Sequence, residues 1–592
     1  MQFWDITTAT YETIARSGKP LGWFNRDKYH NNDRGKQLIG QLFGEYFRAA
    51  YRPLPKRPRP SKAQLRYLEG EIMALIHYGL NTYVDREWGY GDTPVSAFAP
   101  TALNPEQWVL AAKAGGIRRL VLVAKHHDGF CLFPAALNTD YTIANTSWKN
   151  GKGDIVREVR DACVRHGLDF GVYLSPWDRH QASYATADYA AYYQGQWDEI
   201  ISRYGPISEI WLDGANGGDG WYGGAKERRR LPTDARTYYG FDVLLDKLGA
   251  AYPLAVAFGG GNRDNCVVWS GNELGMNPET YWSVKGGVFM PSEADTPFRK
   301  SGWFWHPGDG PKPLSELVEV YFLTVGRNAV LNLGLAPDRA GLIGEDDVAR
   351  LKEFNAYVQR FNATDFAAGA KRREMREGMC LTVTLDLNEA ATFNTVDLRE
   401  DITDGQIVES WTAQAQTEGV WRRIASGTTV GYRRMERFPA VTAKNVRIVL
   451  YGKGACPSLA AAQLRFAPAV KQEAPEEFVQ WRSPFKVSEP VRGTLMFDFL
   501  RLVSVNAIQY IPPKGGIVEG VPDRYEIEIS EDGKTWVKAA EGEFGNLRAN
   551  PVRQIHSLPH KVSMRYARVK AVRALAGEPT WKGSLFEFFM RK

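Results

Sequence analysis

The sequence predicts a protein of the α/β class, a (β/α)8 TIM-like barrel followed by two antiparallel β-sandwich domains. Between residues 64 and 361, short apolar runs alternate with longer helical patterns, which is typical of a parallel α/β fold. Eight such runs within roughly 290 residues fit an eight-stranded barrel, which needs about 250 residues plus insertions. After residue 367 the pattern changes to short segments in which apolar and polar residues alternate, as they do in antiparallel sheets.

The predicted barrel strands are Ala74–Thr82, Leu120–Lys125, Phe170–Leu174, Glu209–Asp213, Leu254–Phe258, Val267–Ser270, an ambiguous run at Gly287–Pro291, and Ala329–Gly334. Between them we expect helices at Pro105–Ala114 with Asn104 as N-cap, Asp154–His166 with Gly167 as C-cap, Ala187–Tyr204, Phe241–Gly249 and Leu314–Gly326. A doubly wound sheet is the alternative architecture. It fits less well, because polar and aromatic residues follow nearly every run rather than one switch point.

We expect four segments along the chain. Residues 1–57 form an N-terminal extension and linker, since prolines and cations crowd Arg52–Pro60. Residues 58–366 form the barrel, 367–474 a first β-sandwich and 475–592 a second. In the last segment, Tyr525–Trp536 places a turn between two strands and resembles galactose-binding-like, discoidin-type modules. Whether that module binds sugar stays open.

Composition narrows the class of protein. A net charge of +6 on 592 residues, with basic residues scattered, argues against a nucleic-acid partner. No run of about 18 uncharged apolar residues exists to enter a membrane. Five cysteines without a CxxC pair indicate neither a zinc site nor a disulfide framework. The 18 Trp and 27 Tyr are many for cores of this size, and sugar sites stack pyranose faces on flat rings.

The N-terminus lacks the basic region, apolar stretch and cleavage site of a signal peptide. We therefore expect a cytoplasmic protein if the sequence is complete, and a periplasmic or secreted one if a signal has been removed. The sequence leaves open whether the chain forms a homo-oligomer.

Side chains at the carboxyl ends of barrel strands converge on one pocket. The predicted ends carry His77, the Glu87-Trp88 pair, His126-His127, Tyr173 and Asp213. Histidines, carboxylates and indoles suit a sugar, whose hydroxyls need hydrogen bonds while its C–H face needs an aromatic wall. Neighbouring residues of a regular strand face opposite sides of the sheet. The chain must therefore bend at His126-His127, or one of the two rings must lie behind the pocket and support the residues that line it. A metal site of His77, His126 and Glu87 is an alternative, but it lacks the close i, i+4 pairing of helical zinc motifs.

Glycoside hydrolysis needs two carboxyl groups. Asp213 follows the apolar Ile210–Leu212 and precedes Gly214, which suits a nucleophile at the barrel mouth; the alternative is an Asp that caps the next turn. Glu273 suits the acid/base, because Trp269 and Trp282 could desolvate its carboxyl and raise its pKa. The alternative for Glu273 is a solvated loop carboxylate, like the neighbouring Glu279, Glu293 and Asp295, which we place in the same loop.

Several segments resemble glycoside hydrolase family 29, the α-L-fucosidases, over residues 58–365. They are His77-Tyr-Gly-Leu-Asn-Thr-Tyr, Arg86-Glu-Trp-Gly, Lys125-His-His-Asp-Gly-Phe-Cys-Leu-Phe, Gly171-Val-Tyr-Leu-Ser-Pro-Trp-Asp, Glu209-Ile-Trp-Leu-Asp-Gly and Asn328-Ala-Val-Leu-Asn-Leu-Gly-Leu-Ala-Pro-Asp. The resemblance implies a retaining double displacement without a cofactor. It implies Asp213 as nucleophile, with fucose held by His77, Glu87, Trp88, His126, His127 and Tyr173; we add Trp282 to this set.

The acid/base is less uniformly placed in this family, so Glu273 rests more on its surroundings. The form Trp269-Ser-Gly-Asn-Glu273 looks like the branch that prefers α-1,3/1,4-linked fucose. The expected partners are fucosylated glycans, with no nucleic acid and no membrane. The long insert Asn216–Tyr239 departs from the family pattern. A barrel glycosidase for another sugar, or a non-catalytic carbohydrate-binding protein, remains the alternative.

Overall fold

The computed structural model describes residues 5–27, 30–50, 57–284, 287–470, 478–480, 485–513, 518–544, 547 and 554–591. The chain divides into two compact units, Met1–Arg57 and Pro58–Lys592. The first unit contains α1 (Ile6–Arg16), the 3-10 helix η1 (Leu21–Trp23) and α2 (Asp33–Ala50). Asp5 caps α1 by accepting from the backbone of Thr7 and Thr8. Much of the proline-rich segment and the expected boundary at residues 474 and 475 lie outside the described residues.

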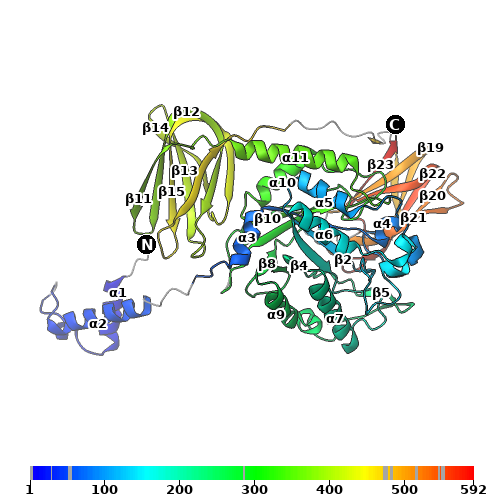
Figure 1. Cartoon of the computed structure of the whole chain (residues 1–592). Helices are drawn as coiled ribbons and strands as arrows, with labels where there is room; N and C mark the ends of the chain where they lie inside the picture. Colours follow the sequence, from blue (N-terminus) through cyan, green and yellow to red (C-terminus); the bar gives the residue numbers. More distant parts are fainter. Residues whose placement is uncertain are drawn as a thin grey trace. The chain divides into compact units, whose positions relative to one another are not determined.

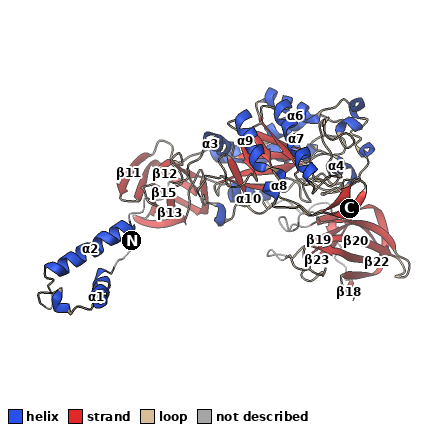
Figure 2. Cartoon of the chain, turned by 90° about the horizontal axis from the view of Figure 1, so that it is seen from below, coloured by secondary structure: helices blue, strands red, loops and turns tan. Residues whose placement is uncertain are grey.

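The second unit is built on a closed barrel of eight parallel strands, which confirms the predicted fold class (Figures 1 and 2). In chain order the strands are β1 (Ile72–Ile76), β2 (Arg119–Lys125), β3 (Asp169–Leu174), β4 (Glu209–Trp211), β7 (Val256–Phe258), β8 (Cys266–Trp269), β9 (Ser292–Pro297) and β10 (Ala329–Leu335). Neighbours in sequence pair around the ring, and β10 closes it by pairing with β1. The doubly wound alternative is therefore wrong.

Helices surround these strands (Figures 1 and 2). They are α3 (Lys62–Gly70), α4 (Leu80–Val84), α5 (Pro105–Ala114), α6 (Ile155–His166), α7 (Ala187–Arg203), α8 (Ala235–Tyr239), α9 (Phe241–Ala251), α10 (Leu314–Thr324) and α11 (Glu345–Ala363), with short 3-10 helices η2 (Val95–Ala97), η3 (Ile143–Asn145), η4 (Trp148–Gly151) and η5 (Glu279–Tyr281). The expected caps are present. Asn104 accepts from two backbone amides of α5, and Gly167 ends α6 at φ 73°, where glycine carries no Cβ penalty.

Two strand predictions need correction. The first strand ends at Ile76 rather than Thr82, because Gly79 turns the chain into α4. The seventh strand is Ser292–Pro297, not Gly287–Pro291. This strand is polar yet fully buried, since inside the barrel Glu293 accepts hydrogen bonds from Tyr67, Trp211 and Asn332. Because β9 contains no apolar run, the sequence pattern did not predict it. The prediction that Glu293 and Asp295 lie in a loop is therefore wrong.

The next domain is an antiparallel sheet of six strands with its own apolar core. Its strands are β11 (Lys371–Glu377), β12 (Cys380–Glu400), β13 (Val408–Thr417), β14 (Val420–Gly427), β15 (Arg434–Gly452) and β16 (Leu459–Arg465). The buried Arg433 joins this domain to the barrel: its Nη1 lies 2.8 Å from a carboxylate oxygen of Glu71, which directly precedes β1. The sheet therefore contacts the amino end of the barrel, away from the mouth.

The C-terminal module is a seven-stranded antiparallel sheet, again with its own core. It consists of β17 (Phe478–Gln480), β18 (Lys486–Val491), β19 (Thr494–Ile511), β20 (Pro522–Ser530), β21 (Val537–Glu543), β22 (Gln554–Ala574) and β23 (Leu585–Arg591). Both antiparallel domains after the barrel are thus present as predicted. Among the helices that the structure describes, none combines the length and apolar character needed to cross a membrane.

Candidate active site

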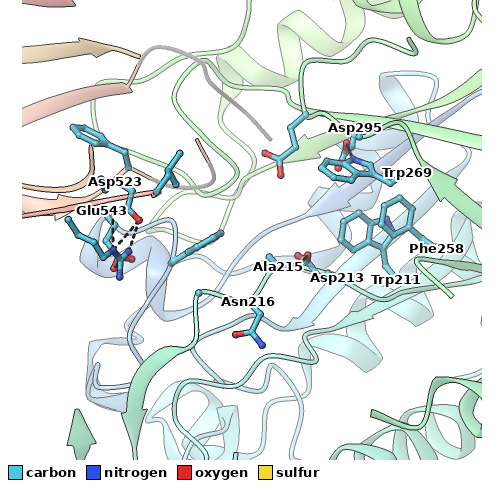
Figure 3. A pocket seen from close by; sticks show the side chains of 18 of the residues that line it. Trp211, Asp213, Ala215, Asn216, Phe258, Trp269, Asp295, Asp523 and Glu543 are labelled. Atoms are coloured by element: carbon cyan, nitrogen blue, oxygen red, sulfur yellow. Dashed lines mark hydrogen bonds and ion pairs between the residues drawn. The ribbon is translucent and has the colours of Figure 1, made fainter. Parts of the chain in front are cut away.

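The carboxyl ends of the barrel strands enclose a cavity that brings seven of the nine predicted site residues together. It is lined by Leu75, His77, Trp88, His126, His127, Tyr173, Trp211, Asp213, Ala215, Glu273, Asp295 and Trp303. A larger cleft of about 670 Å³ lies outside it and shares Trp88, Trp211, Asp213, Ala215, Glu273 and Asp295 as lining residues (Figure 3). The two spaces therefore meet at the carboxyl groups.

Asp213 lies two residues beyond the end of β4, and both of its carboxylate oxygens have donors. The Tyr173 hydroxyl donates to Oδ2 at 2.7 Å, and the Ala215 amide donates to Oδ1 at 2.7 Å. His127 Nε2 lies 3.7 Å from the same Oδ2. Burial raises the pKa of Asp213, whereas the hydrogen bonds from Ala215 and Tyr173 act to lower it. Two donors thus orient the carboxylate and favour its anionic form.

Glu273 lies four residues beyond the end of β8 and is only 8% exposed. Its Oε2 accepts a 2.8 Å hydrogen bond from the Trp303 indole. Burial and the negative charge of Asp295 raise the pKa of Glu273 well above its usual range. A carboxyl group in this environment stays protonated at a pH where an ordinary glutamate is ionised, which suits a proton donor.

The three histidines form a neutral cluster on the barrel floor. The ring centroids of His126 and His127 are 4.1 Å apart, and those of His77 and His126 are 5.4 Å apart. Because β2 ends at Lys125, the histidine pair leaves the regular strand and both rings reach one cavity, as the expected bend requires. Burial, followed by the nearby charges of other histidines and Arg179, holds the pKa of His126 and His127 well below the usual value.

Neutral imidazoles carry one donor and one acceptor nitrogen each, which suits sugar hydroxyls. His127 uses Nδ1 for a 2.8 Å hydrogen bond with Ser175 Oγ, which fixes its ring. Within the part of the chain that the structure describes, Nδ1 of His77 and Nδ1 of His126 are buried without a hydrogen-bond partner. Unsatisfied buried nitrogens are costly, and a polyhydroxylated ligand would pair them.

Glu87 is not among the residues that line the cavity. Its carboxylate instead binds the backbone of the segment that carries Trp303. It accepts from the backbone amides of Trp303 at 2.8 Å and Phe304 at 2.9 Å, and it contacts His306 Nε2 at 2.6 Å. Glu87 therefore acts on the site through Trp303. Among the described residues no group of three His, Cys, Asp or Glu side chains is arranged to hold a metal ion, and Glu87 is already engaged by these donors.

Trp282 is not brought to the site, contrary to its predicted contact with the sugar. From Glu273 at the mouth, the chain must return along the barrel to reach the start of β9 at Ser292, and Trp282 lies on this return. Its indole donates to the Asn277 carbonyl, and its ring packs against the Arg434 guanidinium at 3.9 Å. Sequence proximity to Glu273 was misleading because the return segment spans the length of the barrel.

Five residues that line the cavity were not predicted as site residues from the sequence: Leu75, Trp211, Ala215, Asp295 and Trp303. Two of them act on the carboxyl groups. Asp295, on β9, accepts a 2.8 Å hydrogen bond from the Trp269 indole, and burial raises its pKa well above the usual range. Trp303 follows β9 and donates to Glu273. A polar strand between two apolar ones is the signal that could have indicated Asp295, since barrel interiors accept paired polar groups. Nothing near Trp303 in the sequence indicates its contact.

Comparisons with known proteins match two parts of the chain to described families. A family model described as alpha-L-fucosidase matches residues 64–363, and one described as F5/8 type C domain matches residues 473–586. Alpha-L-fucosidase 1 of Arabidopsis thaliana is 34% identical over 450 residues, which cover 67% of this chain and 85% of that protein.

Among solved structures, a glycoside hydrolase family 29 member from an unknown rumen bacterium has a TM-score of 0.67 at 33% identity, covering 91% of this chain and 100% of its own. A family 29 fucosidase of Ruminococcus gnavus in complex with fucose has a TM-score of 0.62 at 27% identity, covering 70% and 96%. The chain is therefore a glycoside hydrolase that belongs to the α-L-fucosidase family, family 29, and it carries a C-terminal F5/8 type C domain.

Proposed function

We propose that this α-L-fucosidase is a retaining exo-glycosidase that removes terminal fucose through a covalent fucosyl-enzyme intermediate. The observation that carries the proposal is the contrast between two carboxyl groups lining one cavity. Burial raises the pKa of both groups. At Asp213 two donors act against this effect, whereas at Glu273 burial and the charge of Asp295 together raise the pKa well above the usual range. Carboxyl groups whose environments differ in this way divide into nucleophile and acid/base.

In the first step, an oxygen of Asp213 bonds to the anomeric carbon as the glycosidic C–O bond breaks. The leaving oxygen takes the proton of Glu273, so the glycan departs as an alcohol. In the second step, water gives a proton to the Glu273 carboxylate and its oxygen bonds to the anomeric carbon. The bond to Asp213 then breaks, which regenerates both groups and releases fucose.

The cavity walls fit this ligand. Neutral His77, His126 and His127 supply hydrogen-bond donors and acceptors for hydroxyls at little cost in charge. Trp88, Trp211 and Trp303 supply flat apolar surface for the C–H faces and the C5 methyl group of fucose. Because the inner cavity is small and adjoins the larger outer cleft at the carboxyl groups, it suits a terminal sugar rather than an internal one.

We also infer a preference for α-1,3/1,4-linked fucose on branched oligosaccharides or glycoconjugates. This follows the sequence form around Glu273 and the wide outer cleft, which offers space for more than one sugar beyond the bond that is cut. Fucosylated glycans are accordingly the substrates.

The roles are tested by replacing each carboxyl group by glycine and assaying a branched fucosylated trisaccharide with azide. Asp213→Gly should lose about 10³-fold or more in kcat, since the covalent step is removed. Glu273→Gly should be rescued by azide and accumulate α-fucosyl azide, because azide attacks the β-linked intermediate from the face opposite Asp213.

Glu279→Gly is the matched control, because Glu279 is an exposed carboxylate of the same segment and should leave activity unchanged. Full activity of either Asp213→Gly or Glu273→Gly would overturn that role. Activity of the unaltered chain on another 4-nitrophenyl glycoside, but not on the fucoside, would favour a different sugar. Binding without turnover would favour a carbohydrate-binding protein.

A further inference from the structure

The outer cleft has walls from two different domains. One wall belongs to the barrel mouth and includes Asp213, Asn216 and Trp269. The other comes from the C-terminal module and consists of Asp523, Glu543, Phe544, Arg573, Ala574 and Leu575. Figure 3 shows Asp523 and Glu543 across the cleft from Asp213, Trp269 and Asp295.

The module is tied to the barrel beside the cleft by specific polar contacts. Glu543 accepts a 2.5 Å hydrogen bond from the Tyr90 hydroxyl, and Arg573 Nη1 lies 2.9 Å from Asp219 Oδ2 of the barrel insert. Both pairs join residues more than 350 positions apart in the chain. The module wall is therefore joined to the barrel by a hydrogen bond and an ion pair.

The buried Arg179 connects the module to a residue that lines the inner cavity. Arg179 Nη1 donates to the Trp88 carbonyl at 3.2 Å and lies 3.7 Å from Glu543 Oε2. Trp88 lines both the inner cavity and the outer cleft. One arginine therefore joins an aromatic wall of the sugar site to the module.

The chemistry of the module wall suits hydroxyl-rich sugars. The Arg573 charge is matched by Asp219, Asp523 and Glu543, so the wall carries no strong excess of positive charge. Carboxylate oxygens accept from hydroxyl groups, and Ala574 and Leu575 add small apolar patches against which C–H groups can rest. Arg228, from the β6 strand (Ala225–Arg228), adds a donor on the barrel side.

The position of Glu273 indicates which part of the substrate occupies the outer cleft. Glu273 lines both spaces, and as the acid/base it must reach the oxygen between fucose and the next sugar. With fucose in the inner cavity, that oxygen lies at the junction and the remaining sugars extend into the outer cleft. Its volume of about 670 Å³ lies within the range of roughly 300–1,000 Å³ that encloses drug-sized ligands.

We propose that the C-terminal module is part of the active site, and that the end of β22 with Asp523 forms the outer wall of a subsite for the leaving-group oligosaccharide. This inference rests on the proposed fucosidase reaction and deepens it. The module then selects substrates by the glycan that carries fucose, while the barrel alone recognises fucose. A small aryl leaving group does not extend far enough to need the wall.

The test fills the cleft from the module side in the full-length chain. Ala574→Trp should raise KM for a branched fucosylated trisaccharide about tenfold or more, while kcat/KM for 4-nitrophenyl fucoside changes by less than about twofold. Ala574→Ser, which adds little volume, should retain activity on both the trisaccharide and the aryl fucoside. Ala574→Leu should have a KM for the trisaccharide between those of the serine and tryptophan variants. Activity on the aryl fucoside shows at the same time that each variant is folded.

Val572→Trp is the matched control, because Val572 lies on the same strand, is 50% exposed and does not line the cleft. It should leave both activities unchanged. The inference is overturned if Ala574→Trp hydrolyses the trisaccharide normally, or if it loses both substrates equally. Should Ala574→Trp fail to fold, the same two outcomes in Ala574→Leu decide. If instead the unaltered chain releases fucose from neither substrate, the proposed function itself has failed.

Discussion

The Trp303 indole donates a 2.8 Å hydrogen bond to Glu273 Oε2, and this bond opposes the effects of burial and of Asp295 on the same carboxyl. An acid/base must be protonated to start the reaction, so its pKa sets the alkaline limb of the pH profile. Contacts with opposite effects on one pKa should therefore shift that limb in opposite directions. The first two predictions use this relationship.

Trp303→Phe removes a donor that stabilises the Glu273 anion. The pKa of Glu273 should rise further, so the alkaline limb of kcat/KM should move to higher pH. Loss of orientation should lower kcat/KM about 10- to 100-fold, as expected for a hydrogen bond to an ionisable group worth about 1.5–3 kcal/mol. Trp305→Phe is the control, since Trp305 stacks on the Arg339 guanidinium in the same segment. An unchanged limb in Trp303→Phe would contradict the prediction.

Asp295 and Glu273 are both buried with raised pKa values, and Asp295→Asn removes the carboxyl group whose ionisation raises the pKa of Glu273. The pKa of Glu273 should fall and the alkaline limb should move to lower pH, opposite to the shift in Trp303→Phe. The amide also keeps an oxygen that can accept from the Trp269 indole. Profiles measured with 4-nitrophenyl fucoside suffice, and a shift to higher pH would show that Asp295 does not act on Glu273 by charge.

Tyr173→Phe removes the 2.7 Å hydrogen bond to Asp213 Oδ2. The bond favours the carboxylate, so its loss should raise the pKa of Asp213 and move the acidic limb to higher pH. We expect kcat to fall about 10- to 100-fold, from a charged hydrogen bond of about 1.5–3 kcal/mol. The alkaline limb should stay in place, because the Tyr173 hydroxyl donates to Asp213 and the alkaline limb reports Glu273; a shift of both limbs would count against this assignment.

His306 lies between Asp85 and Glu87, at 2.6 Å from each. Burial acts to lower its pKa, but these two carboxylates raise the pKa of His306 to about 10. Because this exceeds the unfolded value of about 6.5, the contribution to stability is full below pH 6.5 and is lost as pH rises through 10.

Glu87→Gln should therefore lower the melting temperature at pH 6, and the difference from the unaltered chain should shrink towards pH 10. The variant should also raise KM, since Glu87 holds the segment that carries Trp303. Arg86→Gln provides a control on the neighbouring position, where the side chain pairs with the partly exposed Asp92. A melting difference that is constant with pH would exclude the charge pairing as its cause.

Periodicity in the sequence predicted most of the barrel because each strand that contacts surrounding helices is apolar. It failed at β9, where the side chains pair with polar groups inside the barrel instead. The end of β2 at Lys125 was predicted correctly, whereas β4 ends at Trp211, two residues before the predicted end at Asp213. Trp282 shows the limit of proximity in sequence, because it follows Glu273 by nine positions while the chain returns towards the other end of the barrel.

The sequence by itself determined the barrel and the succession of antiparallel domains, and it indicated that Asp213 and Glu273 lie at the barrel mouth, because these features depend on local patterns and on the convergence of strand ends. Only the tertiary structure decided which charges face one another. It places Asp295 and Trp303 on Glu273, sets Glu87 behind Trp303, and brings Asp523 and Arg573 of the module to the cleft. These contacts join residues far apart in the chain, and pKa and specificity depend on distances that no local pattern encodes.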